Sequence, residues 1–369
     1  MTSNYNTLIV SGGSIKGLGA LGALQYLDDK NLLQSIETYI GTSIGSFITY
    51  MLILGYSPIE LMAKVISEQL IEKFHKINIV KLAKGFGGLD WKPLEDFILS
   101  LTLDKTEQPM TFKDLYDRFG KKFVCITYNI SQQKTEYLSV DTHPNLLCIA
   151  GIRMSCNIPI LFSRYKYQEN YYIDGGIVDN FPLHSIKETD RVLGIDLTLD
   201  SIQKNKKKES SADTQKQTQN INENAKSNDN TEKNQDNDKC ESNELDKETE
   251  ANELDKETET NELDKSDELV VQQDEHITYP SETQDITWED GDEDLDDYDF
   301  IEYVINVITT PINYHVKCLI NKLKEKNPEH DLITLGLKTR ALNFSIDTHA
   351  KLETFSEGYQ STKKYFENK

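Results

Sequence analysis

Three short segments carry residue types from which a reactive site could be built. Gly41-Thr42-Ser43-Ile44-Gly45 has the GxSxG pattern, whose small residues permit the sharp turn that exposes a nucleophilic serine. Ser11–Gly17 (SGGSIKG) is rich in glycine, so its backbone N–H groups could face an oxyanion or a phosphate. Asp174 precedes two glycines. Taken singly, Ser43 could also be a helix cap and the glycine-rich segment a tight turn, and Asp174 alone is more typical of a turn residue.

Nucleotide-binding motifs fit this sequence poorly. A Walker loop requires GxxxxGK[ST], which is absent. The dinucleotide pattern GxGxxG occurs at Gly17, Gly19 and Gly22, but these positions fall inside a predicted helix and not at its start. The acidic residue expected after the next strand is also missing, because Gly41 follows Ile40. An oxyanion cradle therefore remains the functional interpretation of the first glycine-rich segment.

The elements that must position these residues alternate between strands and helices. Short apolar runs predict strands, and leucines at helical spacing predict a helix between the first two. The apolar run after Ser43 predicts a helix buried on most faces. Such alternation favours an α/β sheet covered on both sides. Strands are predicted at 7–10, 38–40, 123–128, 171–173 and 191–197, helices at 18–27, 44–54 and 351–366, and further ordered segments at 301–308 and 331–337.

In this order, the three motifs resemble those of the patatin-like phospholipase family. That family has a glycine-rich loop of the type GGGxKG, then GxSxG, then DGG, which stand here as SGGSIKG, GTSIG and DGG. Residues 153–162 (RMSCNIPILF) are similar to the family's small-residue segment, and Asp179–Pro182 (DNFP) to the tail of its DGG motif. Residues 331–366 resemble its C-terminal strand and helix. The resemblance covers about 7–200 and 301–366.

The resemblance implies a three-layer α/β/α fold with a mainly parallel central sheet, and a Ser–Asp dyad without histidine. Ser43 would be the nucleophile and Asp174 the base, with the amides of Gly12, Gly13 and Ser14 as oxyanion hole. The implied activity is calcium-independent phospholipid acyl hydrolysis, without cofactor or metal, at peripheral membrane contact. Ser14 replaces a family glycine. If this position needs a positive φ, the hole would be distorted, so an inactive module that binds lipid or a protein is the alternative.

Two other site types are weaker. A Ser–Asp–His triad would take its histidine from those that follow Asp174, and none of these lies in a recognisable motif. They are His184, His315, His330 and His349. A calcium loop is suggested by alternating aspartates at 290–296, but its required glycine is Leu295 and its closing glutamate is Ile301. We therefore interpret that run as a solvated acidic segment.

The charge of the chain is concentrated in one segment. The 369 residues carry a formal charge of −22, and residues 201–300 alone contain 32 acidic and 11 basic side chains. That segment includes a nine-residue repeat beginning at Asn243, Asn252 and Asn261, whose leucines form no continuous stripe on a helix. We predict a disordered acidic insertion, with an unknown partner, in one domain made of 1–200 and 301–369. The nearly neutral remainder is a poor candidate for nucleic-acid binding.

Localisation is predicted from cysteines and apolar runs. The five cysteines are odd in number, widely spaced and without a CxxC, which indicates reduced thiols. The N-terminus lacks the features of a signal peptide, and the longest apolar run, Ile44–Leu54, is too short to span a bilayer. We expect a cytoplasmic protein, peripheral at membranes, and located in a host cytoplasm if the source is viral. Lys204–Lys208 and Phe74–Phe86 are candidate lipid contacts, although core packing is the simpler interpretation of the latter.

Overall fold

An eight-stranded sheet organises the computed structural model, which describes residues 5–74, 78–84, 87–198 and 297–369. The strand order is β5-β6-β3-β2-β1-β7-β8, with β4 paired to β3. The neighbouring strands β3, β2, β1, β7 and β8 pair in parallel. The pairs β3–β4, β3–β6 and β5–β6 are antiparallel. The sheet is therefore mainly parallel. Its strands are β1 (Thr7–Val10), β2 (Thr38–Thr42), β3 (Lys122–Asn129), β4 (Lys134–Ser139), β5 (Tyr165–Tyr167), β6 (Asn170–Asp174), β7 (Val192–Asp196) and β8 (Asp331–Thr334).

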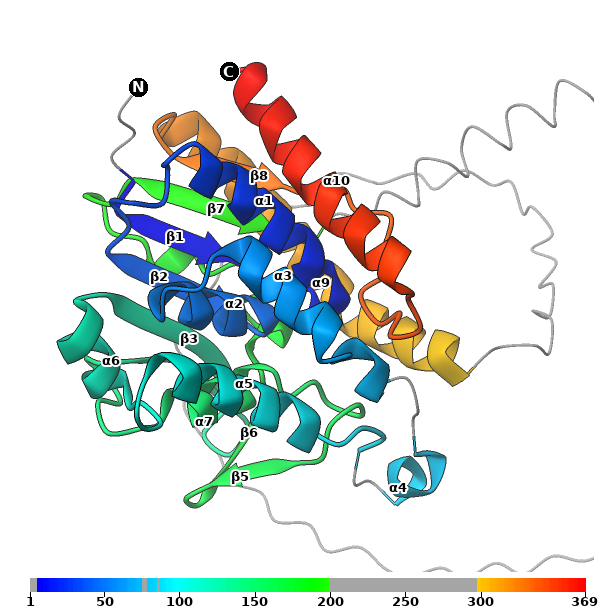
Figure 1. The fold of residues 1–369 in the computed structure, drawn as a ribbon. Coiled ribbons are helices and arrows are strands. Elements are labelled where there is room, and N and C mark those ends of the chain that lie inside the picture. The colour runs from blue at the N-terminus through cyan, green and yellow to red at the C-terminus, as the bar shows by residue number, and fades with distance from the viewer. Residues whose placement is uncertain (1–4, 75–77, 85–86, 199–296) are drawn as a thin grey trace, which may run out of the picture. The chain divides into compact units, whose positions relative to one another are not determined.

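Helices cover both faces of this sheet, which gives the three-layer α/β/α fold (Figure 1). Side chains alternate across β1: Leu8 and Val10 join the larger core, and Ile9 joins the smaller core beneath α9. The helices are α1 (Gly17–Asp29), α2 (Ile44–Ile53), α3 (Pro58–Ser67), α4 (Ile79–Ala83), α5 (Lys92–Lys105), α6 (Phe112–Phe119), α7 (Cys148–Ser155), α9 (Asp297–Lys326) and α10 (Thr348–Glu367), with short 3-10 turns η1 (Ser14–Lys16), η2 (Ile71–Phe74), η3 (Gly175–Ile177) and η4 (Leu183–Ser185).

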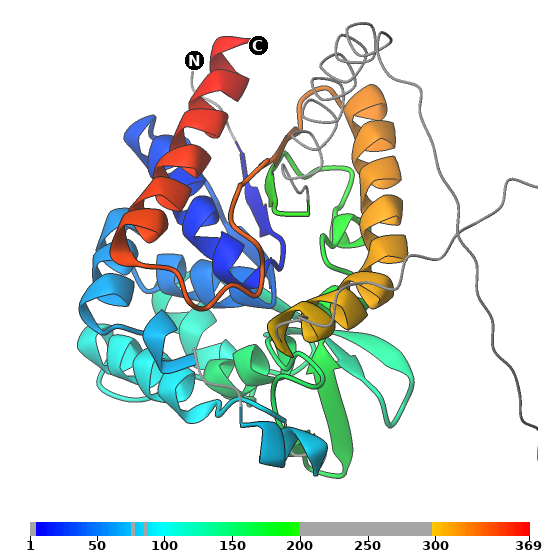
Figure 2. The same cartoon turned by 90° about the vertical axis from the view of Figure 1, so that its right-hand side faces the viewer.

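The predicted strands and helices are confirmed to within a few residues, but several elements escaped prediction. The segment expected around 301–308 is part of the 30-residue helix α9, which contains Pro311 and bends along its length (Figure 2). One side of the helix is buried at Val316 and Ile320, whereas Tyr314 is exposed. The strands β4 and β5 and helices α3, α5, α6 and α7 had no assignment from sequence.

The C-terminal helix packs against the first helix at backbone distance. A Cβ on Gly22 would lie 1.8 Å from the carbonyl oxygen of Phe355, and one on Gly358 would lie 1.9 Å from that of Gly19. The GxGxxG pattern therefore lies inside α1, as predicted, and two of its glycines serve helix packing. The third, Gly17, faces Ile44 of α2.

Some sequence predictions fall outside the described residues. These are the insertion at 201–300 up to Asp296, the acidic run 290–296, Lys204–Lys208 and Cys240. The four cysteines in the described part of the chain are free thiols. Phe74 is buried in the larger core, so the candidate lipid segment that begins there is anchored by packing. Among the described helices, none alone is long and apolar enough to span a bilayer, though α2 and α3, bent by 118°, would meet that test together.

Candidate active site

Ser43 occupies a strained turn between β2 and α2. Its φ of 53° and ψ of −127° lie outside the regions that a residue with a Cβ normally adopts. The flanking glycines explain why the turn can form, because a Cβ on Gly41 would lie 2.5 Å from Gly45 backbone and one on Gly45 would lie 2.1 Å from the carbonyl oxygen of Val10. The GxSxG segment thus has the geometry of a nucleophile elbow.

Strand register brings Ser43 and Asp174 together. Strand β2 pairs with one edge of β3, and its last pair is Thr42 with Ile126. Strand β6 pairs with the next residues on the same edge of β3, beginning at the pair Thr127–Asp174. The residue after the end of β2 therefore meets the last residue of β6. Ser43 Oγ donates a hydrogen bond of 2.6 Å to Asp174 Oδ2.

The environment of Asp174 changes its acidity. The side chain is 4% exposed, and burial raises its pKa from 3.8 to about 7, although hydrogen bonds from Ser43 and from the Gly176 amide act in the opposite direction. The Gly176 bond to Oδ1 measures 2.7 Å. A carboxylate with a pKa near neutrality is a much better base for a serine hydroxyl than an ordinary aspartate.

The glycine-rich loop lies beside this pair and is tied to it by Asn180. The Gly12 amide donates to Asn180 Oδ1 at 3.0 Å, and Asn180 Nδ2 donates back to the Gly12 carbonyl at 3.3 Å. The Gly12 amide therefore already has a partner. The resemblance named the DNFP segment without assigning Asn180 a contact, and sequence alone offered no signal for one.

Ser14 has the positive φ that the sequence analysis raised as a concern. Its φ is 49°, in the left-handed region, whereas Gly13 is extended with a φ of 173°. The serine adopts a backbone conformation that glycine reaches without strain. Within the described residues, neither the Gly13 nor the Ser14 amide is paired with a backbone carbonyl or a side chain.

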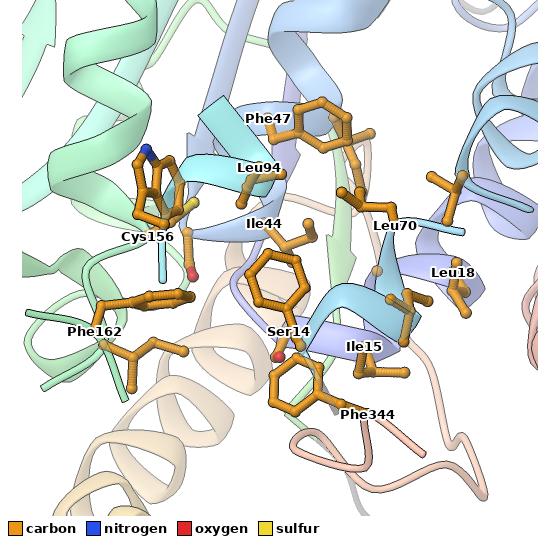
Figure 3. A pocket seen from close by; sticks show the side chains of 18 of the residues that line it. Ser14, Ile15, Leu18, Ile44, Phe47, Leu70, Leu94, Cys156, Phe162 and Phe344 are labelled. Carbon is orange, nitrogen blue, oxygen red and sulfur yellow. The ribbon is translucent and has the colours of Figure 1, made fainter. Parts of the chain in front are cut away.

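Two pockets meet at Ser14, Ser43 and Ile158. The first is lined almost entirely by apolar side chains. Figure 3 shows these aromatic and aliphatic groups around the pocket. Its lining includes Phe47, Leu70, Trp91, Leu94, Phe162 and Phe344. The second also has many apolar lining residues, but we call it the polar pocket because it holds Asp174, the glycine-rich loop and Lys16; it is bordered by Ile308 and Asn313 of α9. An apolar chain and a polar group could thus lie on either side of Ser43.

The four candidate histidines lie elsewhere. His184 and His315 stack with ring centroids 6.3 Å apart and face Asp179, whose pKa is raised mainly by burial. His330 Nδ1 accepts from the Val192 amide, and His349 is exposed on α10. The hydrogen-bond partner of the Ser43 hydroxyl is Asp174, so the histidine triad has no support in this geometry. No cluster of metal-ligating side chains occurs within the described ranges.

Part of this chain is similar in sequence to known proteins. Residues 8–186 match the family model described as patatin-like phospholipase. A probable lipid hydrolase, 463L, of invertebrate iridescent virus 6 is 34% identical over 188 residues, which cover 48% of this chain and 62% of that protein. The lysophospholipase NTE1 of Kluyveromyces lactis is 26% identical over 183 residues, 48% of this chain and 11% of the yeast protein. The chain therefore carries a domain of the patatin-like phospholipase family.

The solved structures are less similar in sequence than these relatives. VipD from Legionella pneumophila is 20% identical, with a TM-score of 0.37, and the match covers 55% of this chain and 52% of VipD. ExoU of Pseudomonas aeruginosa, in complex with SpcU, is 18% identical, also with a TM-score of 0.37, over 53% and 44% of the two chains. The matches span less than two thirds of the length of the curated relatives described above.

Proposed function

We propose that this protein hydrolyses fatty-acyl esters of phospholipids through a covalent acyl-enzyme on Ser43. The observation that carries the proposal is the 2.6 Å hydrogen bond from Ser43 Oγ to the buried carboxylate of Asp174 at the junction of an apolar and a polar pocket. The apolar pocket suits an acyl chain, and the polar pocket suits the glycerol and head group. The viral relative named as a probable lipid hydrolase supports this substrate class.

In the proposed reaction, Asp174 takes the hydroxyl proton as Ser43 Oγ attacks the ester carbonyl. The tetrahedral oxyanion would receive hydrogen bonds from the Gly13 and Ser14 amides, since the Gly12 amide is bonded to Asn180. Collapse breaks the ester C–O bond, and the departing alcohol takes the proton from Asp174. Water, deprotonated by the same carboxylate, then hydrolyses the acyl-enzyme and releases the fatty acid.

The test compares fatty-acid release from mixed phospholipid vesicles, with EDTA present, for the wild type, Ser43→Ala and Asp174→Asn. We expect each variant to lose at least about 10³-fold in kcat, because nucleophile and base act as a unit. Labelling of Ser43 by a fluorophosphonate would report the nucleophile independently. Release by the Ser43→Ala variant at the wild-type rate would refute the mechanism.

A catalytically inactive module that binds lipid or a protein is the second candidate, motivated by the left-handed conformation of Ser14. Failure of the wild type to hydrolyse any lipid or to react with the fluorophosphonate would favour it. We also propose that the protein is cytoplasmic and associates peripherally with membranes. The mouth of its active site would then face the membrane.

A further inference from the structure

Large apolar side chains are exposed around the mouth of the polar pocket. On α9, Val307 is 56% exposed, Ile308 43% and Tyr314 71%, and Ile160 is 39% exposed on the loop after α7. Ile308 and Ile160 both line the pocket that contains Asp174. Exposed apolar residues scattered singly need no explanation, but a group at the edge of a candidate active site indicates an apolar contact surface. We refer to Ile160, Val307, Ile308 and Tyr314 as the rim.

Ile160 is held at the rim against a conformational cost. Its φ is 74°, which is strongly unfavourable for a β-branched residue. Its carbonyl accepts a hydrogen bond of 3.2 Å from the Gly88 amide, so a neighbouring loop helps to fix this conformation. Strain of this kind persists where surrounding contacts impose it and is concentrated at functional sites.

Helix α9 is anchored on one side and open on the other. Val316 and Ile320, 3% and 4% exposed, pack into the smaller core beneath the sheet. The outward side carries Val307 and Ile308 in its N-terminal half, then Tyr314, and then the exposed Lys317 and Lys322 toward its C-terminal end. Exposed apolar side chains combined with lysines on the same helix are a feature of helices that lie in a membrane interface.

We propose that the rim docks on a phospholipid bilayer, with Val307 and Tyr314 entering the acyl boundary and Lys317 and Lys322 facing anionic head groups. This inference rests on the proposed function, since docking there would bring the polar pocket against the lipid surface. Residues 201–300 carry 32 acidic and 11 basic side chains, which anionic lipid repels. The rim must therefore supply more of the attraction than the lysines.

The test measures co-sedimentation of the full chain with phosphatidylcholine vesicles containing one fifth phosphatidylserine. Val307→Gln with Tyr314→Gln removes the two rim residues that do not line the pocket. The matched control is Leu103→Gln with Tyr116→Gln, one aliphatic and one tyrosine, each 45% exposed on α5 and α6. Figure 1 shows α6 at the left of the molecule and the N-terminal part of α9, in yellow, at the right.

We expect the rim variant to bind vesicles about tenfold less tightly or worse, because burial of two large apolar side chains is lost. The control should bind like the wild type, and both should hydrolyse a soluble short-chain ester at the wild-type rate. Lys317→Gln with Lys322→Gln should weaken binding only to vesicles with phosphatidylserine, and less so at high salt.

Unchanged vesicle binding by the rim variant, or no binding by the wild type, would overturn the inference and leave the rim as a surface for a protein partner. The soluble-ester assay separates this from failure of the proposed function. Ester hydrolysis without rim-dependent binding removes only the docking proposal. Rim-dependent binding without any hydrolysis supports the docking surface and removes the acyl-hydrolase proposal.

Discussion

Asp174 combines burial with a position beside the candidate nucleophile, and the two have opposite consequences for stability and activity. Its folded pKa of about 7 exceeds the unfolded value, so the native state favours the protonated form. The stability that the protonated Asp174 carboxyl contributes to the native state is complete at low pH, declines as pH rises from about 4, and is lost once pH passes 7. A pKa moved from 3.8 to about 7 corresponds to on the order of 4 kcal/mol of lost stability.

We therefore expect Asp174→Asn to raise the melting temperature at pH 8 and to change it little at pH 4, while activity is lost at both. Asparagine is neutral and can donate to the Ser43 hydroxyl while accepting from the Gly176 amide. Wild-type kcat/KM should fall about tenfold for each pH unit below 7, since the protonated carboxyl cannot act as base. A variant no more stable than the wild type at pH 8 would show that ionised Asp174 is not a source of instability.

Replacement of Ser14 by glycine tests whether the strained left-handed backbone at this position affects stability or catalysis. Because the serine already has the φ of 49° that glycine would adopt, the loop amides keep their orientation. Ser14→Gly should thus add about 1 kcal/mol to the free energy of unfolding and change kcat by less than roughly threefold. Gln133→Gly is the control, with a φ of 51° in an exposed turn. A hundredfold gain in kcat for Ser14→Gly alone would mean that the serine distorts the oxyanion hole.

At the scale of elements, sequence pattern located the pieces better than their pairing. The strands and helices around Ser43 and Asp174 were predictable, because apolar periodicity and glycine turns are local signals. The pairing of β2 and β6 with successive residues on one edge of β3 was not predictable, because it depends on the register between strands far apart in the chain. The Gly12–Asn180 link joins residues 168 positions apart, and no local pattern encodes it. The predicted boundary of the insertion at residue 300 was wrong, because helix α9 already begins at Asp297, where the acidic composition obscured its start.

The packing of α1 on α10 reverses the usual effect of a helical glycine. Gly22→Ala should normally stabilise a helix by up to about 1 kcal/mol. Here the new Cβ would meet the Phe355 carbonyl oxygen at 1.8 Å, so we expect a loss of roughly 3 kcal/mol in chemical denaturation. Gly151→Ala is a graded control, because its nearest neighbours would be side-chain atoms, namely ring atoms of Phe112 at 3.0 and 3.1 Å and Leu138 Cδ1 at 3.5 Å. Equal losses in both variants would argue against backbone contact as the cause.

At the scale of the whole molecule, segments on both sides of residues 201–300 form one compact unit. Helix α10 packs on α1, and β8 pairs with β7 in parallel from Leu193–Asp331 onward. We expect that cleavage at an engineered protease site within 201–300 will leave two fragments that co-elute in gel filtration and retain esterase activity. Fragments that separate without denaturant would show that the covalent link is required.

During synthesis, β7 is complete well before β8, the strand with which it pairs. At about 5 to 20 residues per second, the ribosome needs roughly 5 to 20 s to make the 100 residues between these two halves. Throughout that interval the outer edge of β7 has no strand beside it, and the glycine face of α1 has no helix against it. An open strand edge is a template for aggregation. The nascent N-terminal half is therefore the form of this protein most in need of a chaperone.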